Sequence, residues 1–478
     1  MSSRTTIVWF RKDLRLADNP ALHAAAQRGP IVPVFIWAPE EEADWAPGEA
    51  SRWWLNQSLG ALEDQLRTLG SRLMLCRGSS QAVLQSLVRA SGAEAVYWNR
   101  RYEPAVIERD KKIKQGLTAA GIEAKSFSGS VLFEPWTVEN KTGGPFRVFT
   151  PFWKACLAQG SPSLPLPIPA SLQQPAVWPN SIDRASLELD SGIDSARGLS
   201  AAWRPGSLEA ENGLGRFAAT ALSSYAEDRD RLDGEALSRL SAHLHFGEIS
   251  PRQIWERVEK TYLERGDSAA KGDAYLRQLG WREFAYHQLY HFPHTTDQPL
   301  RSEFESFAWE HDDESLRAWQ RGETGVPIID AAMRHLSYEG WLPNRVRMVV
   351  ASYLTKNLLI SWREGVAWFW DKLIDADLAN NTFGWQWTAG CGADAAPYFR
   401  IFNPVIQSAK FDPQGEYIHR WIPALRQVPM PWLGKPWDAP HAILKQAGVC
   451  LGKTYPVPLI DLAFSRQRAL ASYAKMRQ

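Results

Sequence analysis

The first 130 residues alternate short apolar runs with helix-like segments. Four runs are rich in apolar and β-branched residues: Thr6–Phe10, Ile31–Trp37, Arg72–Cys76 and Ala95–Trp98. Helical patterns lie between them, at Pro20–Gln27, Ala50–Leu69 and Ser79–Ser91. Nearly continuous apolar strands that alternate with helices predict a parallel sheet covered on both faces. No G-x-G-x-x-G follows the first run, so the usual dinucleotide-binding loop is not predicted there.

A proline-rich stretch and then a long helical pattern follow. Residues 160–180 contain six prolines, which exclude a helix or a central strand and predict a surface linker. From about residue 201 onward, apolar residues recur with helical spacing. This spacing predicts helices over Leu208–Tyr225, Pro251–Leu263, Asp273–Tyr290, Asp330–Glu339, Pro343–Ile360 and Trp362–Ile374. We expect an α/β domain over residues 1–130, a linker over 131–200 and an all-α domain over 201–478.

Composition narrows the class of protein. The 478 residues are 45% hydrophobic and 22% charged, which is ordinary for a globular chain and excludes disordered, collagen-like and coiled-coil chains. No apolar run reaches the roughly 18 residues that a membrane span needs, and the N-terminus lacks the apolar core of a secretion signal. The four cysteines form no C-x-x-C pair, and no Cys/His set has zinc spacing, so we expect no metal site. A cytoplasmic protein with reduced thiols is the expectation.

Tryptophan content and charge distribution depart from the average. The chain has 23 tryptophans, and a large aromatic core accounts for most of them. Residues 341–478 hold 16 Lys and Arg against 9 Asp and Glu, whereas residues 201–340 hold 16 against 24. A basic C-terminal part is typical of proteins that bind a polyanion such as nucleic acid. An ordinary solvated surface is the alternative.

Two segments of the helical part carry candidate chemistry. The hydroxyls and backbone N–H groups of residues 237–241 can bind a phosphate at a helix start, although a helix N-cap is the alternative. Farther on, Asn344, Arg347 and Met348 have i, i+3, i+4 spacing. A buried Arg347 needs an anionic partner, for which Asp375 and Asp377 are candidates. Asp, Asn and Arg side chains beside Trp are suited to binding a planar, redox-active ring. The alternative is a buried ion pair that holds two helices together.

Long strings of the sequence resemble the photolyase/cryptochrome family. They include WFRKDLRLADNPAL at residues 9–22, WNRRYEP at 98–104, LSRLSAHLHFGEISPRQ at 237–253, WREFAYH at 281–287, GVPIIDAAMRHL at 325–336 and all of residues 375–421. The resemblance extends over essentially the whole chain. It is strongest to bacterial cyclobutane pyrimidine dimer (CPD) photolyases, and SRLSAHLHFGE and WNRRYEP are similar to the class III branch related to plant cryptochromes.

The resemblance implies a Rossmann-like N-terminal domain and non-covalently bound FAD in the helical domain. The expected FAD contacts are Tyr225, Leu237, Ser238, Arg239, Leu240, Ser241, Tyr275, Arg282, Asn344, Arg347, Asp375, Ala376, Asp377 and Asn381. Asn381 matches the family residue that faces flavin N5. Leu237 replaces the usual Thr, so one hydroxyl contact is expected to be missing. Trp309, Trp362 and Trp385 match the family's electron-transfer chain from the surface to the flavin.

The resemblance also implies the substrate, which is UV-damaged DNA containing pyrimidine dimers, bound by a monomer. The expected lesion and DNA contacts are Gln278, Trp281, Asn344, Arg345, Met348, Trp387, Arg400, Gln407 and Lys410. Branches that repair (6-4) lesions carry His near the positions of Asn344 and Met348, so this chain is more similar to the CPD enzymes. Gln278 stands where the best-known bacterial branch has Glu. The expected reaction is light-driven electron transfer from reduced FAD, which splits the dimer.

The N-terminal domain of the family usually holds a light-harvesting antenna pigment, a folate or a deazaflavin. Ala105 and Val106 align with the folate-binding Asn-Glu pair, and Arg101 aligns with the Asp of the deazaflavin pattern, so neither known site is intact. The class III resemblance favours methenyltetrahydrofolate near Trp37, Arg52 and Glu103, with a deazaflavin as the alternative.

Two other functions remain as alternatives within the family. One is a cryptochrome-type blue-light photoreceptor, which Asn381 disfavours because plant cryptochromes typically have Asp there. The sequence printed ends soon after residue 475 without the polar tail that cryptochromes usually carry. The other alternative is a (6-4) photolyase, which Gln278 favours weakly and Asn344 and Met348 disfavour.

Overall fold

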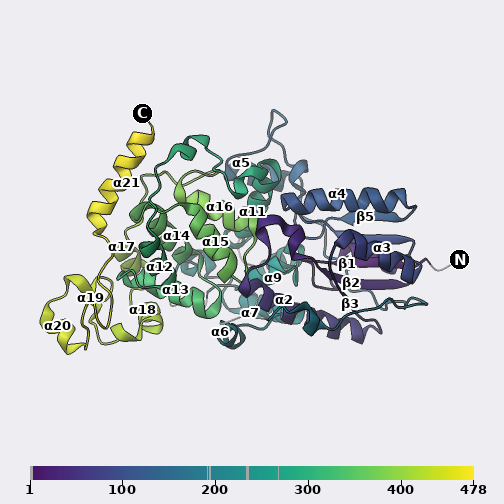
Figure 1. The fold of residues 1–478 in the computed structure, drawn as a ribbon, viewed down its shortest axis with the longest axis horizontal. Helices are drawn as coiled ribbons and strands as arrows, with labels where there is room; N and C mark the ends of the chain where they lie inside the picture. Colours follow the sequence, from purple (N-terminus) through teal and green to yellow (C-terminus); the bar gives the residue numbers. More distant parts are fainter. Residues whose placement is uncertain (1–3, 191, 193–194, 233–235, 267–268, 478) are drawn as a thin grey trace.

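A five-stranded parallel sheet lies at one end of the molecule, and a body of helices forms the rest (Figure 1). The computed structural model describes residues 4–190, 192, 195–232, 236–266 and 269–477. The strands are β1 (Thr6–Phe10), β2 (Ile31–Trp37), β3 (Met74–Arg77), β4 (Ala95–Asn99) and β5 (Glu123–Phe127). Their order across the sheet is β3-β2-β1-β4-β5, so the direction of winding reverses between β1 and β4.

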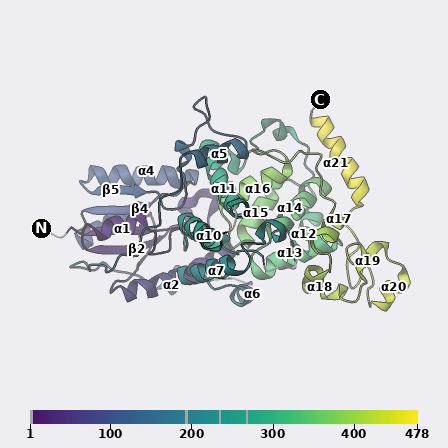
Figure 2. The same cartoon turned by 180° about the vertical axis from the view of Figure 1, so that it is seen from behind.

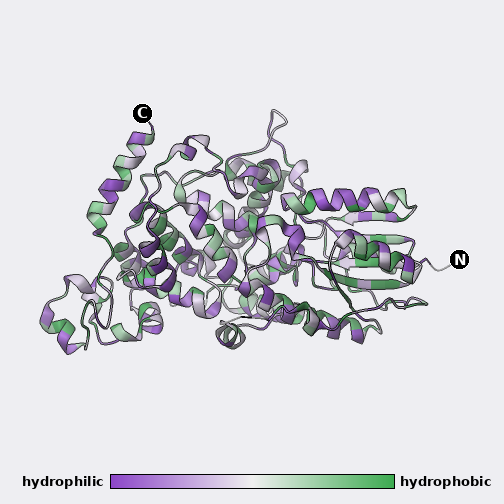
Figure 3. Ribbon diagram, in the orientation of Figure 1, coloured by the Kyte–Doolittle hydropathy of each residue, from purple (hydrophilic) through white to green (hydrophobic). Residues whose placement is uncertain are grey.

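Both faces of the sheet are buried, which explains why its central strands are apolar throughout. On one face, Val8 and Phe10 pack with helices α1 (Pro20–Ala26) and α2 (Glu49–Thr68). On the other, Ile7 and Trp9 pack with α3 (Ser80–Ser91) and α4 (Pro104–Ala119). Figure 3 shows the strands as mostly hydrophobic and α4 as largely hydrophilic. The predicted doubly covered parallel sheet is confirmed.

The sequence pattern missed β5 and α4. β5 reads EAKSF and is an edge strand whose residues are half-buried or exposed. α4 buries only Val106, Ile113 and Leu117 along its 16 residues. Both elements therefore carry too few apolar positions for periodicity to reveal them.

Residues 131–200 contain more structure than a plain linker. They include a 3-10 turn, η2 (Pro135–Thr137), and helices α5 (Phe149–Ala158) and α6 (Ala196–Ala202). Residues 160–180 have no helix or strand, as their prolines predict. This stretch is attached along the sheet, where the N–H of Asp18 donates to the Leu166 carbonyl and that of Ile31 to the Gln173 carbonyl.

The helical body contains many short helices around a few long ones, and α7 and α10 lie side by side in the rear view (Figure 2). Its helices are α7 (Ser207–Thr220), α8 (Tyr225–Asp228), α9 (Ser241–His245), α10 (Pro251–Arg265), α11 (Ala269–His291), α12 (Asp313–Arg321), α13 (Pro327–Glu339), α14 (Asn344–Ser352), α15 (Trp362–Lys372), α16 (Leu378–Ala389), α17 (Pro404–Phe411), α18 (Glu416–Trp421), α19 (Met430–Leu433), α20 (His441–Gln446) and α21 (Leu462–Met476).

Two predicted helices differ in detail. The helix expected over Leu208–Tyr225 stops at Thr220, and a separate turn, α8, begins at Tyr225. The helix expected over Pro343–Ile360 begins at Asn344 and passes into a π-helical turn at Tyr353–Asn357. Among the residues that the structure describes, no helix is both long and apolar enough to span a membrane.

The sheet and the helical body meet through a close backbone contact. Gly247 follows α9 with φ of +64°, and a Cβ there would lie 2.2 Å from the Lys12 carbonyl oxygen. Arg15, which is buried beside this contact, donates to the carbonyl oxygens of Gly247 and Gly129. Only glycine allows this approach without strain, so α9 is held directly against the loop that follows β1.

Candidate functional site

A cavity of about 520 Å³ opens in the helical body. Its wall is built from the segment between α8 and α9 and from helices α11, α14, α15 and α16. This volume is in the range of sites that bind a cofactor-sized molecule.

One end of the cavity is lined by backbone and hydroxyl groups. Ser238, Arg239 and Ser241 line it, and the indole N–H of Trp341 donates to Ser241 Oγ at 3.0 Å. Arg239 has φ of +53°, a left-handed conformation that is unfavourable for a residue with a side chain. Such strain clusters at ligand sites. The Arg239 guanidinium lies 4.0 Å from the Trp203 ring centroid and pairs with Glu339 at 3.1 Å.

The predicted pair between Arg347 and an acidic residue is formed with Asp375. Arg347 Nη2 lies 2.8 Å from Asp375 Oδ2, and Arg347 Nε donates to the Leu342 carbonyl oxygen at 2.8 Å. Asp375 Oδ1 is buried and has no hydrogen-bond partner among the described residues. A buried acceptor without a partner is costly, so this oxygen is placed to accept from a water or from a bound molecule.

Asp377 lines the same wall and organises its surroundings. Its Oδ1 accepts from the backbone N–H of Asn380 at 2.9 Å and so caps α16, while Oδ2 accepts from the Tyr286 hydroxyl at 2.6 Å. Burial raises the pKa of Asp377, but His245, whose Nδ1 lies 3.8 Å from Asp377 Oδ2, outweighs it together with the Arg282 guanidinium and the Tyr286 hydrogen bond, and the pKa lies well below its ordinary value. Asp377 is therefore a buried carboxylate that stays charged.

α16 presents three cavity-lining residues at helical spacing. Asp377 at the cap, Asn381 and Trp385 follow one another at intervals of four, so they lie on one face. The Asn381 side-chain amide donates to the Val366 carbonyl oxygen of α15 at 3.1 Å, which fixes its orientation.

Two half-buried indoles, Trp281 and Trp387, also line the cavity. Trp281 stacks on Phe149 with ring centroids 3.7 Å apart and planes 10° apart. Asn344 and Met348 lie on the adjoining turn of α14, with Asn344 Nδ2 3.8 Å from Met348 Sδ. Indole walls with the Asn344 amide beside them are suited to flat rings that carry carbonyl groups.

The structure brings most of the expected residues to this cavity. Every expected FAD contact lines it except Ala376, which lines a second cavity. Of the expected lesion contacts, Gln278, Trp281, Asn344, Arg345, Met348 and Trp387 line it. Arg400, Gln407 and Lys410 do not line it; Arg400 and Lys410 are exposed, and Gln407 and Lys410 lie on α17. Their assignment as DNA contacts remains a prediction.

The three expected electron-transfer tryptophans differ in exposure. Trp385 is 3% exposed and lines the cavity, Trp362 is buried at the start of α15, and Trp309 is half-buried. Trp309 lies 4.4 Å from the Phe307 ring, between centroids. Of the three, Trp385 touches the cavity, and Trp309 is the most exposed. Their role as an electron-transfer chain remains a prediction.

The sequence reasoning did not assign Arg229, His245 and Asn380, which also line the cavity. Arg229 stands four residues after Tyr225, on the spacing that places it near Tyr225 in a helical turn, and it lies 5.9 Å from that ring centroid. Asn380 is adjacent to Asn381. His245 had no local signal, because its position depends on how α9 is held against the sheet.

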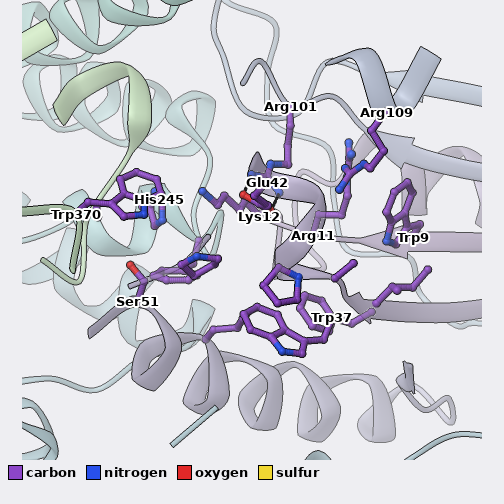
Figure 4. A pocket seen from close by; sticks show the side chains of 18 residues that line it. Trp9, Arg11, Lys12, Trp37, Glu42, Ser51, Arg101, Arg109, His245 and Trp370 are labelled. Atoms are coloured by element: carbon purple, nitrogen blue, oxygen red, sulfur yellow. Dashed lines mark hydrogen bonds and ion pairs between the residues drawn. The ribbon is translucent and has the colours of Figure 1, made fainter. Parts of the chain in front are cut away.

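A second, smaller cavity of about 50 Å³ lies where the sheet meets the helices (Figure 4). His245 and Trp370 lie on one side of it, and Trp9 with Arg11 and Arg109 lies on the other. It is located at the carboxyl ends of β1, β2 and β4, where the winding of the sheet reverses and where α/β sheets bind ligands. His245 lines both cavities.

Buried charges surround this second cavity. Arg101 pairs with Glu42 at 2.5 Å and with Glu103 at 2.7 Å. Burial opposes the charges, but the pairing raises the pKa of Arg101 and lowers those of Glu42 and Glu103. Of the three expected antenna residues, Trp37 lines the cavity, whereas Arg52 and Glu103 do not.

The larger cavity fits FAD. Ser238, Ser241 and Arg229 would provide donors for the phosphates, and the unpartnered Asp375 oxygen would accept from a ring N–H. Trp385 and Phe369 supply aromatic wall beside the carboxylates. This donor set combines anion binding at one end with a polar, planar slot at the other.

Comparison with known proteins supports this assignment. Residues 275–475 match the FAD binding domain of DNA photolyase, and residues 6–171 match the DNA photolyase family model. The chain is 45% identical to deoxyribodipyrimidine photo-lyase of Agrobacterium fabrum over 100% of both chains. It is 40% identical to Cryptochrome-2 of Arabidopsis thaliana over 99% of this chain and 79% of that one. A class III photolyase from Agrobacterium tumefaciens superposes with a TM-score of 0.95 at 45% identity, covering 100% of this chain and 98% of the other.

Proposed function

Because the chain belongs to the photolyase/cryptochrome family, we propose that it is a light-driven DNA repair enzyme that splits cyclobutane pyrimidine dimers. The observation that carries the proposal is that Trp281 and Trp387 line the same cavity as the Arg347–Asp375 pair. A flat lesion between the two indoles would therefore share one cavity with FAD.

The protein's own residues position the lesion. A damaged pair is extruded from the duplex at lower energy than an intact one, which lets the dimer enter the cavity. Asn344 orients a pyrimidine carbonyl with its amide N–H, and Met348 fills irregular apolar space. Arg400 and Lys410 are exposed and attract the phosphates. When bound, reduced FAD supplies one electron to the dimer on absorbing light and recovers it after the ring opens.

The test is repair of an oligonucleotide that contains one cyclobutane dimer. The purified protein carrying reduced FAD should restore the pyrimidines under blue light and leave the dimer intact in the dark. Binding of the oligonucleotide without any light-dependent repair would contradict the proposal.

We propose that the second cavity holds the antenna pigment, and that the pigment is methenyltetrahydrofolate. Its position at the carboxyl ends of the strands supports this proposal, as do Trp37 for stacking and Arg109 for an anionic tail. The enclosed volume of about 50 Å³ means that a pigment would be only partly enclosed. Mass spectrometry of the released small molecules should find a folate. A deazaflavin, or only FAD from cells able to make both pigments, would contradict the assignment.

A photoreceptor of the cryptochrome type is the second candidate, favoured by the 40% identity to Cryptochrome-2. It predicts light-dependent binding of a partner protein without dimer repair, so the repair assay separates the two. We also propose a cytoplasmic monomer built from residues 1–130, 131–200 and 201–478. Light scattering of the purified protein tests the monomer, and limited proteolysis tests the boundaries.

A further inference from the structure

A row of aromatic side chains runs from Tyr286, which lies behind the wall of the larger cavity, to the surface. Tyr286 on α11 binds Asp377 of the cavity wall. The Tyr102 ring centroid lies 5.7 Å from that of Tyr286, and the Trp136 centroid lies 6.3 Å from that of Tyr102. Tyr102 is 1% exposed and Trp136 is 39% exposed, so the row begins in the interior and ends in solvent.

Each tyrosine in the row donates its hydroxyl hydrogen to a carboxylate. Tyr286 donates to Asp377 Oδ2 at 2.6 Å, and Tyr102 donates to Glu134 Oε2 at 2.8 Å. Burial, followed by these carboxylates, raises the pKa of both phenols well above the ordinary value, so both are neutral at rest. An oxidised phenol is a strong acid, and here its proton has a receiving oxygen already in hydrogen-bond contact.

Cations near the row make the loss of the proton necessary. The Arg282 guanidinium lies 4.6 Å from the Tyr286 ring centroid, and that of Arg100 lies 5.6 Å from the Trp136 centroid. A positive charge left on Tyr286 would be repelled by Arg282 at short range. Electron loss from Tyr286 is therefore favourable only when the proton moves to Asp377 at the same time.

The row is held by fixed contacts. The Pro135 carbonyl oxygen, next to Trp136, lies 3.2 Å from His287 Nδ1 and 3.0 Å from His291 Nε2 on α11. Glu134 also pairs with Arg100 at 2.7 Å. These contacts attach the 3-10 turn η2 to the helix that carries Tyr286, and they keep the ring distances short.

We propose that Tyr286, Tyr102 and Trp136 form a second electron-supply route to the cavity, with Tyr-to-carboxylate proton transfer at each tyrosine. The inference rests on FAD binding within the proposed function. The oxidant is oxidised flavin excited by light. It takes one electron from Tyr286, whose O–H bond breaks as its proton passes to Asp377.

The remaining steps restore each residue in turn. Tyr102 gives an electron to the Tyr286 radical and its proton to Glu134, while Asp377 returns the proton to Tyr286. Trp136 then gives an electron to the Tyr102 radical, which recovers its proton from Glu134. The oxidised Trp136 takes an electron from a thiol in solution, which becomes a thiyl radical and releases its proton to water. The net change is one electron passed from the thiol to the cavity.

The test uses the full-length FAD-loaded protein with Trp385→Phe, which closes the expected tryptophan route. Tyr102→Phe and Trp136→Phe are added to this background one at a time. Trp178→Phe is the matched control, because Trp178 is half-buried with Arg72 over its ring at 4.4 Å but lies in the proline-rich stretch packed against the sheet. Electron paramagnetic resonance with deuterated tyrosine detects the tyrosyl radical, and peptide mass spectrometry detects oxidised Trp136.

The parent variant should give a tyrosyl signal under blue light and oxidation at Trp136. Tyr102→Phe should abolish the oxidation at Trp136 and most of the remaining flavin photoreduction. Trp136→Phe, a surface change, should prolong the tyrosyl signal, and Trp178→Phe should match the parent. An unoxidised Trp136 in the parent, or photoreduction unchanged by Tyr102→Phe, would overturn the route. If the route fails but the chemically reduced protein still repairs dimers, the proposed function stands. If the protein does not take up FAD, both the route and the proposed function are wrong.

Discussion

Arg347 Nη2 lies 2.8 Å from one oxygen of Asp375, and the other oxygen of that carboxylate is buried without a hydrogen-bond partner in the described part of the chain. The arginine fixes the carboxylate, and the free oxygen faces no protein donor. This arrangement would stabilise a bound ring that offers an N–H, so we expect the charge of Asp375 to contribute to holding FAD.

Replacing Asp375 by Asn should weaken FAD binding. The amide keeps the size of the side chain but removes the charge that pairs with Arg347. We expect a loss of about 1.5–3 kcal/mol, the scale of a hydrogen bond to a charged group. Titration of the apoprotein with FAD measures it. Glu188→Gln is the control, because Glu188 forms an exposed pair with Arg77 at 3.1 Å. Equal FAD affinity of Asp375→Asn and wild type would show that the carboxylate does not contact the cofactor.

Spacing along one helix predicted part of the site, because Asn344, Arg347 and Met348 have i, i+3, i+4 spacing and the structure places all three in the cavity wall. Asp377, Asn381 and Trp385 were expected from the family resemblance, and the structure places them in the same wall. Ala376 lies between two cavity residues in sequence, but it lines the other cavity. Ala376 precedes α16, so helical spacing does not determine which way its side chain points.

The second cavity could not be predicted in the same way. Arg11, Glu42 and Arg101 come from three separate segments of the chain, and their proximity depends on the order of the strands. No local pattern records this proximity. The edge strand β5 was not predicted for a different reason. An exposed edge strand does not need the apolar residues that mark a central strand.

Replacing Trp385 or Trp362 by Phe should suppress photoreduction of oxidised FAD by an external thiol. Phenylalanine is much harder to oxidise than tryptophan, and Trp385 is the expected tryptophan that touches the cavity. Absorbance during blue illumination measures the rate. Repair by chemically reduced protein should fall much less, because its electron travels from FAD to the lesion. If both single variants photoreduce at the wild-type rate, the tryptophan route is wrong.

Replacing Trp281 by Ala should weaken binding of dimer-containing DNA by roughly 1–3 kcal/mol, the scale of stacking between a base and an aromatic side chain. Fluorescence anisotropy with damaged and undamaged duplexes measures the difference. Trp281→Phe separates stacking from the support that Trp281 gives to Phe149, and it should retain part of the affinity.

Lys410→Ala should affect DNA binding differently from Trp281→Ala when both are measured on the same duplexes. An exposed lysine that contacts phosphate should affect damaged and undamaged duplexes alike and reduce the slope of affinity against salt by about 1. An equal loss on both duplexes with Trp281→Ala would instead remove Trp281 from lesion recognition.

Lys356 should make stability depend on pH. Its ammonium donates to the Arg400 carbonyl oxygen at 3.1 Å, and the residue is 1% exposed. Burial lowers the pKa of Lys356 from 10.5 to about 7. Between these values the unfolded chain binds more protons than the folded one, so this residue makes stability rise with pH across the window.

Lys356→Met should remove this rise. The free energy of unfolding of wild type relative to the variant should increase from the lower to the upper end of the window, as measured by urea denaturation. Lys260→Met is the control, because Lys260 is 65% exposed and should show no such trend. If the difference in free energy of unfolding between wild type and Lys356→Met stays constant from pH 7 to 10.5, Lys356 is charged in the folded protein across this range.

Lesion choice tests the central claim most directly. Chemically reduced, FAD-loaded protein is given two oligonucleotides, one with a cyclobutane dimer and one with a (6-4) lesion, under the same blue light. The cavity offers Asn344 and Met348 beside the two indoles, without a histidine proton donor at either position. We predict reversal of the cyclobutane dimer and no reversal of the (6-4) lesion. Reversal of the (6-4) lesion with no action on the cyclobutane dimer would contradict the account.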